Sequence, residues 1–92
     1  MSYKLEFTDD ADEHLQAHIK AGNKQLLTKI YSLFEELQEH PQTGTGKPKL
    51  LKYKSAGVWS RRINDKHRLL YKIENETLTV FVISLWGHYD DK

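Results

Sequence analysis

The 92-residue sequence contains no cysteine, only two prolines and a single methionine. The lack of thiols excludes disulfide bonds, a cysteine nucleophile and cysteine-based zinc or iron–sulfur sites. Apolar runs are short: none approaches the ~20 residues of a membrane-spanning helix, and the first ten residues lack the basic and apolar regions of a secretion signal. We therefore expect a soluble protein of the reducing cytoplasm, folded as one domain over residues 1–92.

A strong overall charge is also missing, because the formal net charge is only +1. The charges are nevertheless spread unevenly along the chain. Residues 1–46 carry four lysines and eight acidic residues, whereas residues 47–72 carry nine lysines and arginines and, as the single acid, Asp65. A basic segment of this density, with tryptophan and tyrosine nearby, favours a polyanionic partner such as nucleic acid over a merely solvated sheet face.

The N-terminal half has the pattern of one strand followed by two helices. Alternation over residues 3–7 predicts a half-buried strand, and Thr8 is placed to cap a helix whose first turn is acidic. Gly22 predicts the end of that helix, and Asn23 predicts the start of a second helix that Pro41 terminates. Both helices are amphipathic and therefore need a surface on which to pack.

The C-terminal half changes to the period-two pattern of strands. A loop from Gln42 to Pro48 is followed by predicted strands at Leu50–Lys54, Val58–Ile63, Arg68–Ile73 and Leu78–Trp86. The last of these is the most apolar, so we expect a central strand buried on both faces. The order β-α-α-β-β-β-β predicts an α+β domain in which two helices cover one face of a largely antiparallel sheet.

Two arginines of the basic segment are expected to meet on the open face of this sheet. Alternation puts Arg62 on the face opposite Arg61, and Arg68 opens the next strand after a tight turn. Two cations this close repel one another unless an anion lies between them, and a guanidinium pair suits bidentate recognition of phosphate. Lys49 and Lys52 would border the same concavity.

The last predicted strand leads to His88 and Tyr89, which would emerge beside the two arginines. Imidazole has an unperturbed pKa near neutrality, so it can donate or accept a proton during phosphodiester cleavage. Arginine, lysine, histidine and tyrosine together, without a set of metal ligands, suit RNA cleavage in which the substrate's own 2′-hydroxyl attacks the adjacent phosphorus. We therefore expect no metal and no other cofactor.

The same segments resemble a known family. The resemblance is carried by GTGKP at residues 44–48, LLK at 50–52, GVWSRRI at 57–63, HRLLY at 67–71 and HY at 88–89. These motifs look like those of the YoeB/Txe toxins of the RelE superfamily. The match is strong from Gly44 to Tyr71 and at the His-Tyr pair, whereas the helical half matches only in pattern.

This resemblance implies an endoribonuclease toxin that enters the ribosomal A site, cleaves messenger RNA and is held inactive by a cognate antitoxin similar to YefM or Axe. The catalytic arginine of the family falls on Arg68, its His-Tyr pair on His88 and Tyr89, and its supporting basic residues on Lys52 and Arg62. By family role, His88 would protonate the leaving 5′-oxygen, Arg68 would stabilise the phosphate charge, and Tyr89 would orient the phosphate or stack near the base. Operator DNA would be bound only through the antitoxin complex, and no membrane partner is implied.

One position departs from the family pattern. YoeB toxins usually carry a glutamate after Gly-Lys-Pro as the general base for the 2′-hydroxyl, and this chain has Lys49 there. A lysine acts as a base only if its pKa is strongly depressed, which nearby cations favour. Three alternatives stay open: Lys49 as the base, His88 or Tyr89 as the base with Lys49 as the acid, or a weakened enzyme. We expect a working enzyme with rearranged roles.

The basic segment supplies further candidates for contact with RNA, which are Lys47, Lys52, Lys54, Arg61 and Arg62. A different class of function also fits this segment. A catalytically weak module could use the basic sheet to dock RNA, the ribosome or the antitoxin, and act mainly as a corepressor. The residues Arg68, His88 and Tyr89 discriminate the two readings, because cleavage needs them and docking does not.

Two histidines of the first predicted helix, His14 and His18, have the four-residue spacing that can chelate a metal. No third ligand is clearly placed to complete such a site. We therefore expect this pair to face solvent.

Overall fold

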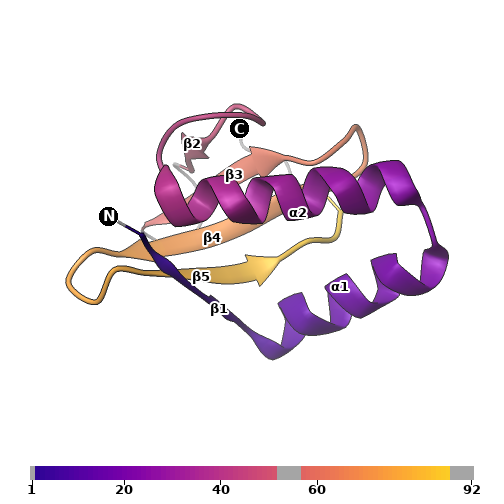
Figure 1. The fold of residues 1–92 in the computed structure, drawn as a ribbon, viewed down its shortest axis with the longest axis horizontal. Helices are drawn as coiled ribbons and strands as arrows, with labels where there is room; N and C mark the ends of the chain where they lie inside the picture. Colours follow the sequence, from indigo (N-terminus) through magenta and orange to yellow (C-terminus); the bar gives the residue numbers. More distant parts are fainter. Residues whose placement is uncertain (1, 52–56, 88–92) are drawn as a thin grey trace.

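The computed structural model of the chain describes residues 2–51 and 57–87. Within these ranges the elements follow the predicted order β-α-α-β-β-β-β (Figure 1). They are β1 (Lys4–Phe7), α1 (Asp9–Ala21), α2 (Lys24–Glu39), β2 (Lys49–Leu50), β3 (Val58–Arg62), β4 (Arg68–Glu74) and β5 (Thr79–Ser84).

The helix ends lie where their capping residues predicted them. The Thr8 hydroxyl accepts a hydrogen bond from the Ala11 N–H at 3.1 Å, and the Asn23 side chain accepts one from Leu26 at 3.0 Å. Gly22 ends α1 in the left-handed conformation, at φ 74°. Local signals of this kind therefore sufficed to fix the bounds of both helices.

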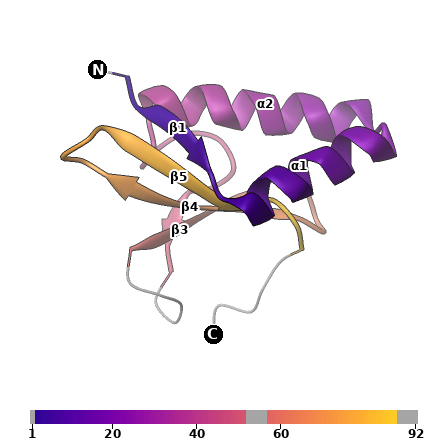
Figure 2. The same cartoon turned by 90° about the horizontal axis from the view of Figure 1, so that it is seen from below.

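The strands form one sheet in the order β1-β5-β4-β3-β2. β1 is parallel to β5 and the other pairs are antiparallel, so the predicted largely antiparallel sheet is confirmed. Both helices lie on the same side of this sheet, as Figure 2 shows. Neither helix covers the opposite side, which we call the open side, and the Arg62 side chain that alternates onto it is exposed.

The hydrophobic core lies between the helices and the covered side of the sheet. The largest contributions come from the apolar stripe of α2 and from inward residues of β4 and β5, namely Leu26, Ile30, Leu33, Leu37, Leu69, Tyr71, Val80 and Val82. This arrangement corrects one expectation, since β5 is an inner strand but is not buried on both faces. Its Phe81 is 41% exposed, because nothing in the described chain covers that side.

The strand predicted at Leu50–Lys54 is only partly open to comparison. β2 covers Lys49–Leu50 and pairs with β3, where Lys49 lies opposite Ser60. Residues 52–54 of the predicted strand lie outside the described residues. The pairing of β2 nevertheless places Lys49 on the open side, next to the strand that carries Arg62.

Candidate phosphate-binding site

Arg62 and Arg68 are direct cross-strand partners in the β3–β4 hairpin. Both line a pocket of about 190 Å³ on the open side of the sheet, together with Gly46, Lys47, Lys49 and Ser60. The lining therefore holds four basic side chains and, among the residues the structure describes, no carboxylate. The sequence predicted this meeting of the two arginines and the position of Lys49 beside them, and the geometry confirms both.

The turn between β3 and β4 orients the two guanidinium groups. Arg62 forms an ion pair with Asp65, and its side chain is 48% exposed. Arg68 Nη1 donates to the carbonyl oxygen of Asn64 at 2.6 Å and to that of His67 at 3.2 Å. These contacts keep both groups at the mouth of the hairpin while leaving them donors with which to bind an anion.

The loop before β2 brings two lysines, Lys47 and Lys49, to the same pocket. The loop is held against β3 by a hydrogen bond from the Arg62 N–H to the Gly46 carbonyl oxygen at 2.7 Å. Gly46 has φ +87°, and a Cβ there would lie 2.9 Å from the Arg62 carbonyl oxygen. Only glycine permits this close approach, so it is a condition for placing the lysines beside the arginines.

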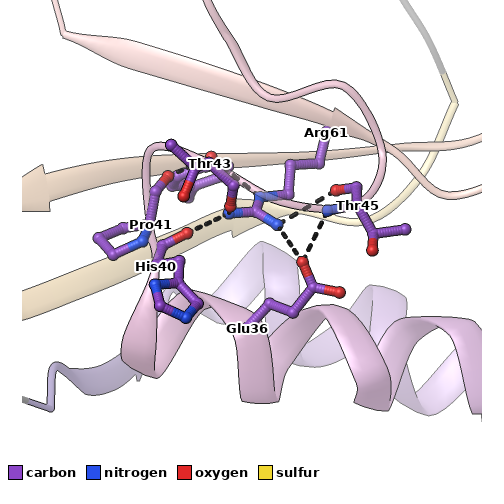
Figure 3. A network of polar contacts seen from close by, with 7 residues as sticks. Glu36, His40, Pro41, Thr43, Thr45 and Arg61 are labelled. Atoms are coloured by element: carbon purple, nitrogen blue, oxygen red, sulfur yellow. Dashed lines mark hydrogen bonds and ion pairs between the residues drawn. The ribbon is translucent and has the colours of Figure 1, made fainter.

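Arg61 does not belong to this pocket, and its prediction as an RNA-binding residue is wrong. Its side chain is fully buried on the helix-covered side. All five guanidinium N–H groups have acceptors (Figure 3): Tyr71 Oη at 3.2 Å, Glu36 Oε1 at 3.0 Å, and the carbonyl oxygens of Thr45 at 3.1 Å, Thr43 at 2.6 Å and His40. A buried and fully paired guanidinium has no donor left for a phosphate.

The Arg61 network also organises the loop that carries the lysines. Glu36 Oε1 accepts a second hydrogen bond from the Thr45 N–H at 2.7 Å, and the Tyr71 hydroxyl donates to the Pro41 carbonyl oxygen at 2.7 Å. Burial alone would raise the pKa of Glu36, but the hydrogen bonds from Thr45 and Arg61 outweigh it and lower that pKa. Burial raises the pKa of Tyr71, against the opposing effect of Arg61. Both side chains therefore hold their hydrogen bonds at neutral pH.

Sequence reasoning did not identify Glu36 as a structural residue. Its position beside the apolar stripe, between Leu33 and Leu37, was the available signal. It could not show which cation Glu36 meets, since Arg61 is 25 residues away in sequence.

The prediction that His14 and His18 face solvent is also wrong. His18 is 1% exposed, and its ring stacks on Trp86 with centroids 4.8 Å apart. His14 Nδ1 accepts a hydrogen bond from the Leu85 N–H at 3.2 Å. Both histidines thus contact the chain just beyond β5, which periodicity along one helix cannot reveal. Within the described ranges, no group of three or more histidine or acidic side chains is arranged so that it could hold a metal ion.

Four further site predictions, Lys52, Lys54, His88 and Tyr89, lie outside the described residues. The described chain ends at Gly87, whose carbonyl oxygen accepts a hydrogen bond from the Arg68 N–H at 2.8 Å. The residue that precedes His88 is therefore bound to the first residue of β4, beside the pocket.

Comparison with known proteins agrees with this arrangement. Residues 7–89 match the family model described as YoeB-like toxin of bacterial type II toxin-antitoxin system. The chain belongs to this family. Toxin YoeB of Synechocystis sp. is 38% identical over 86 residues, which cover 94% of this chain and 96% of that toxin.

Solved structures of YoeB toxins share the fold. A YoeB/ParE toxin from Agrobacterium tumefaciens is 31% identical and superposes with a TM-score of 0.84, covering 94% of this chain and 99% of that one. The YoeB–YefM complex from Staphylococcus aureus gives 29% identity and a TM-score of 0.79, covering 97% and 100% of the two chains. None of the helices in the described part of the chain has the length and apolar character needed to span a bilayer.

Proposed function

We propose that this YoeB-family toxin cleaves messenger RNA in the ribosomal A site and so inhibits translation. The observation that supports the proposal is the pocket in which Arg62 and Arg68 are paired in register and bordered by Lys47 and Lys49. Four cations around a small concavity suit a phosphodiester, and the donor geometry of two guanidiniums suits its oxygens.

The reaction needs only side chains and the RNA itself. The substrate's 2′-oxygen attacks the adjacent phosphorus, the bond to the 5′-oxygen breaks, and a 2′,3′-cyclic phosphate or its 3′-phosphate product and a 5′-hydroxyl remain. Arg68 stabilises the negative charge on the phosphate, and Arg62 and Lys47 hold neighbouring phosphate groups. His88 protonates the leaving 5′-oxygen, and Tyr89 orients the phosphate. No metal or other cofactor takes part in this scheme.

Lys49 lines the pocket, which supports a catalytic role for it where YoeB toxins usually have a glutamate. It lies opposite Ser60 in the β2–β3 pair and shares the pocket with Arg62 and Arg68. Lys49 therefore serves either as the base for the 2′-hydroxyl or as an acid, with His88 or Tyr89 as the base. Replacement of the usual base also supports a second candidate function, a catalytically weak corepressor that binds RNA or antitoxin through the same pocket.

The proposed inhibitor is a cognate antitoxin of the YefM or Axe type. A YoeB toxin of Staphylococcus aureus has been solved with YefM. An acidic antitoxin segment laid over the four cations would block access of RNA. The same complex would bind operator DNA, and both events would take place in the cytoplasm.

End mapping on a defined RNA tests the proposal. The protein is incubated with a ribosome complex that displays a known A-site codon, and in parallel with the same RNA free of ribosomes. We expect cleavage within that codon, only on the ribosome, with a 5′-hydroxyl on the downstream fragment and loss of cleavage in His88→Ala. Intact RNA in every lane, together with tight binding to the ribosome or antitoxin, would contradict cleavage and support the corepressor.

A further inference from the structure

Three histidine side chains bind the backbone of the chain just beyond β5. The Leu85 N–H donates to His14 Nδ1 at 3.2 Å, and the Leu85 carbonyl oxygen accepts from His18 Nε2 at 2.9 Å. Two residues on, the Gly87 N–H donates to His67 Nδ1 at 2.8 Å. Backbone groups that the sheet no longer pairs are thus satisfied by imidazoles from α1 and from the β3–β4 turn.

The three rings also pack around Trp86. His18 lies edge-on to His67 with centroids 4.8 Å apart, and the Trp86 ring lies 4.8 Å from His18 and 4.7 Å from His67. His14 approaches the same indole at 6.3 Å. We call His14, His18, His67 and Trp86 the histidine cluster. Mutual packing of four rings restricts each imidazole to the orientation that its hydrogen bond requires.

The histidine cluster is joined directly to the proposed active site. His67 binds the Gly87 N–H, and the next residue, Arg68, donates its own N–H to the Gly87 carbonyl oxygen at 2.8 Å. The Arg68 guanidinium in turn lines the cationic pocket. The N–H and the carbonyl oxygen of Gly87 are therefore hydrogen-bonded to two consecutive residues of the hairpin, His67 and Arg68. His88 follows Gly87 in sequence.

We propose that His14, His18 and His67 are positioning residues, which fix Leu85–Gly87, the segment that precedes His88 in sequence, against α1 and the first residue of β4. The structural part of this inference rests on the hydrogen bonds above. Its catalytic consequence rests on the proposed function. His67 is the decisive member of the three histidines, because it is the one that binds Gly87, the residue before His88, and it directly precedes Arg68 in the chain.

The hydrogen bond that His67 accepts requires an unprotonated Nδ1. Burial lowers the pKa of His67, and the nearby charges of His18, Lys66 and His14 lower it further. The titratable and charged groups near its ring are these two histidines from α1 and Lys66, and Asp65 lines the same pocket as His67. The neutral form therefore prevails at neutral pH, and acid would convert Nδ1 into a donor facing the Gly87 N–H.

Two variants of His67 distinguish the contribution of its aromatic ring from that of its hydrogen-bond acceptor. His67→Phe keeps an aromatic ring for His18 and Trp86 but leaves the Gly87 N–H without an acceptor. His67→Asn loses the ring but can place Oδ1 near the position of Nδ1. We expect Gly87 amide exchange to be about tenfold faster in His67→Phe, corresponding to loss of one hydrogen bond, and to be restored towards the parent in His67→Asn.

Single-turnover cleavage on saturating ribosomes supplies the catalytic readout. We expect about a tenfold lower rate for His67→Phe with unchanged ribosome Kd, recovery in His67→Asn, and a weaker acid-side loss of rate in His67→Asn than in the parent. Parent-like Gly87 exchange and cleavage in His67→Phe would overturn the inference. If the parent itself does not cleave, the proposed function fails, and Gly87 exchange alone decides whether His67 fixes the chain.

Discussion

Arg61 and Arg62 are neighbours in β3, yet they belong to two different regions of the molecule. Arg61 is fully buried on the helix-covered side, where five acceptors take all of its donors. Arg62 lies on the open side, where it pairs with Asp65 at the surface and lines the cationic pocket. An arginine thus stabilises the fold at one position and is available for binding at the next. The alternation of side chains along β3 decides which face, and therefore which role, each arginine has.

The two regions are nevertheless coupled through the loop before β2. On the covered side, Arg61 binds the carbonyl oxygens of His40, Thr43 and Thr45. On the open side, the same loop continues through Gly46 into the pocket with Lys47. The buried arginine therefore acts on the pocket indirectly, by fixing the loop that forms one of its walls.

Replacing Arg61 is expected to give the largest loss of stability. Arg61→Ala leaves the carbonyl oxygens of His40, Thr43 and Thr45 without this donor and removes one of the two hydrogen bonds to Glu36. Because each buried polar group left unpaired costs about 1–3 kcal/mol, we expect a total loss of at least about 3 kcal/mol. Urea unfolding would measure the change. Arg62→Ala is the matched control, because its exposed pair with Asp65 contributes at most about 1 kcal/mol. Equal destabilisation by the two variants would contradict the assignment of these arginines to different regions.

Replacing Arg68 should show the opposite behaviour, a loss of activity without a loss of fold. If the proposed cleavage is correct, Arg68→Ala lowers the single-turnover rate by about 100- to 1,000-fold, as removal of a donor to transition-state charge usually does. Arg68→Lys keeps the charge but loses the planar fork, so we expect an intermediate rate. A parent-like rate in Arg68→Ala at unchanged melting temperature would remove Arg68 from the mechanism.

The fold could be predicted from the sequence because its signals are local. Thr8, Gly22 and Asn23 mark the helix ends through contacts within three or four residues. Alternation placed Arg62 beside Arg68 because a tight hairpin fixes the register of its two strands. The family motifs then supplied the expected chemistry of that pair.

The roles that could not be predicted depend on contacts between distant segments. Alternation separated Arg61 from Arg62, but it could not show that the loop after α2 returns to surround Arg61 with carbonyl oxygens. The positions of His14 and His18 likewise depend on the chain at Leu85, about 70 residues away. Helical spacing suggested a metal ligand pair or a solvent-facing pair, and neither describes what they do.

The smallest effect that still distinguishes the two regions is the pH dependence of the stability that Glu36 contributes. Because its pKa is lower in the folded than in the unfolded chain, ionised Glu36 contributes stability above its ordinary pKa of about 4.5, and this is lost as the pH falls through the folded value. Glu36→Gln keeps an oxygen acceptor but does not titrate. We expect the difference in unfolding free energy between parent and variant to shrink by less than about 1 kcal/mol from pH 6 to pH 3. Asp65→Asn is the control at pH 6, because its exposed pair with Arg62 contributes little to stability. A larger loss of stability in Asp65→Asn than in Glu36→Gln at that pH would place the stabilising charge pair on the binding side instead.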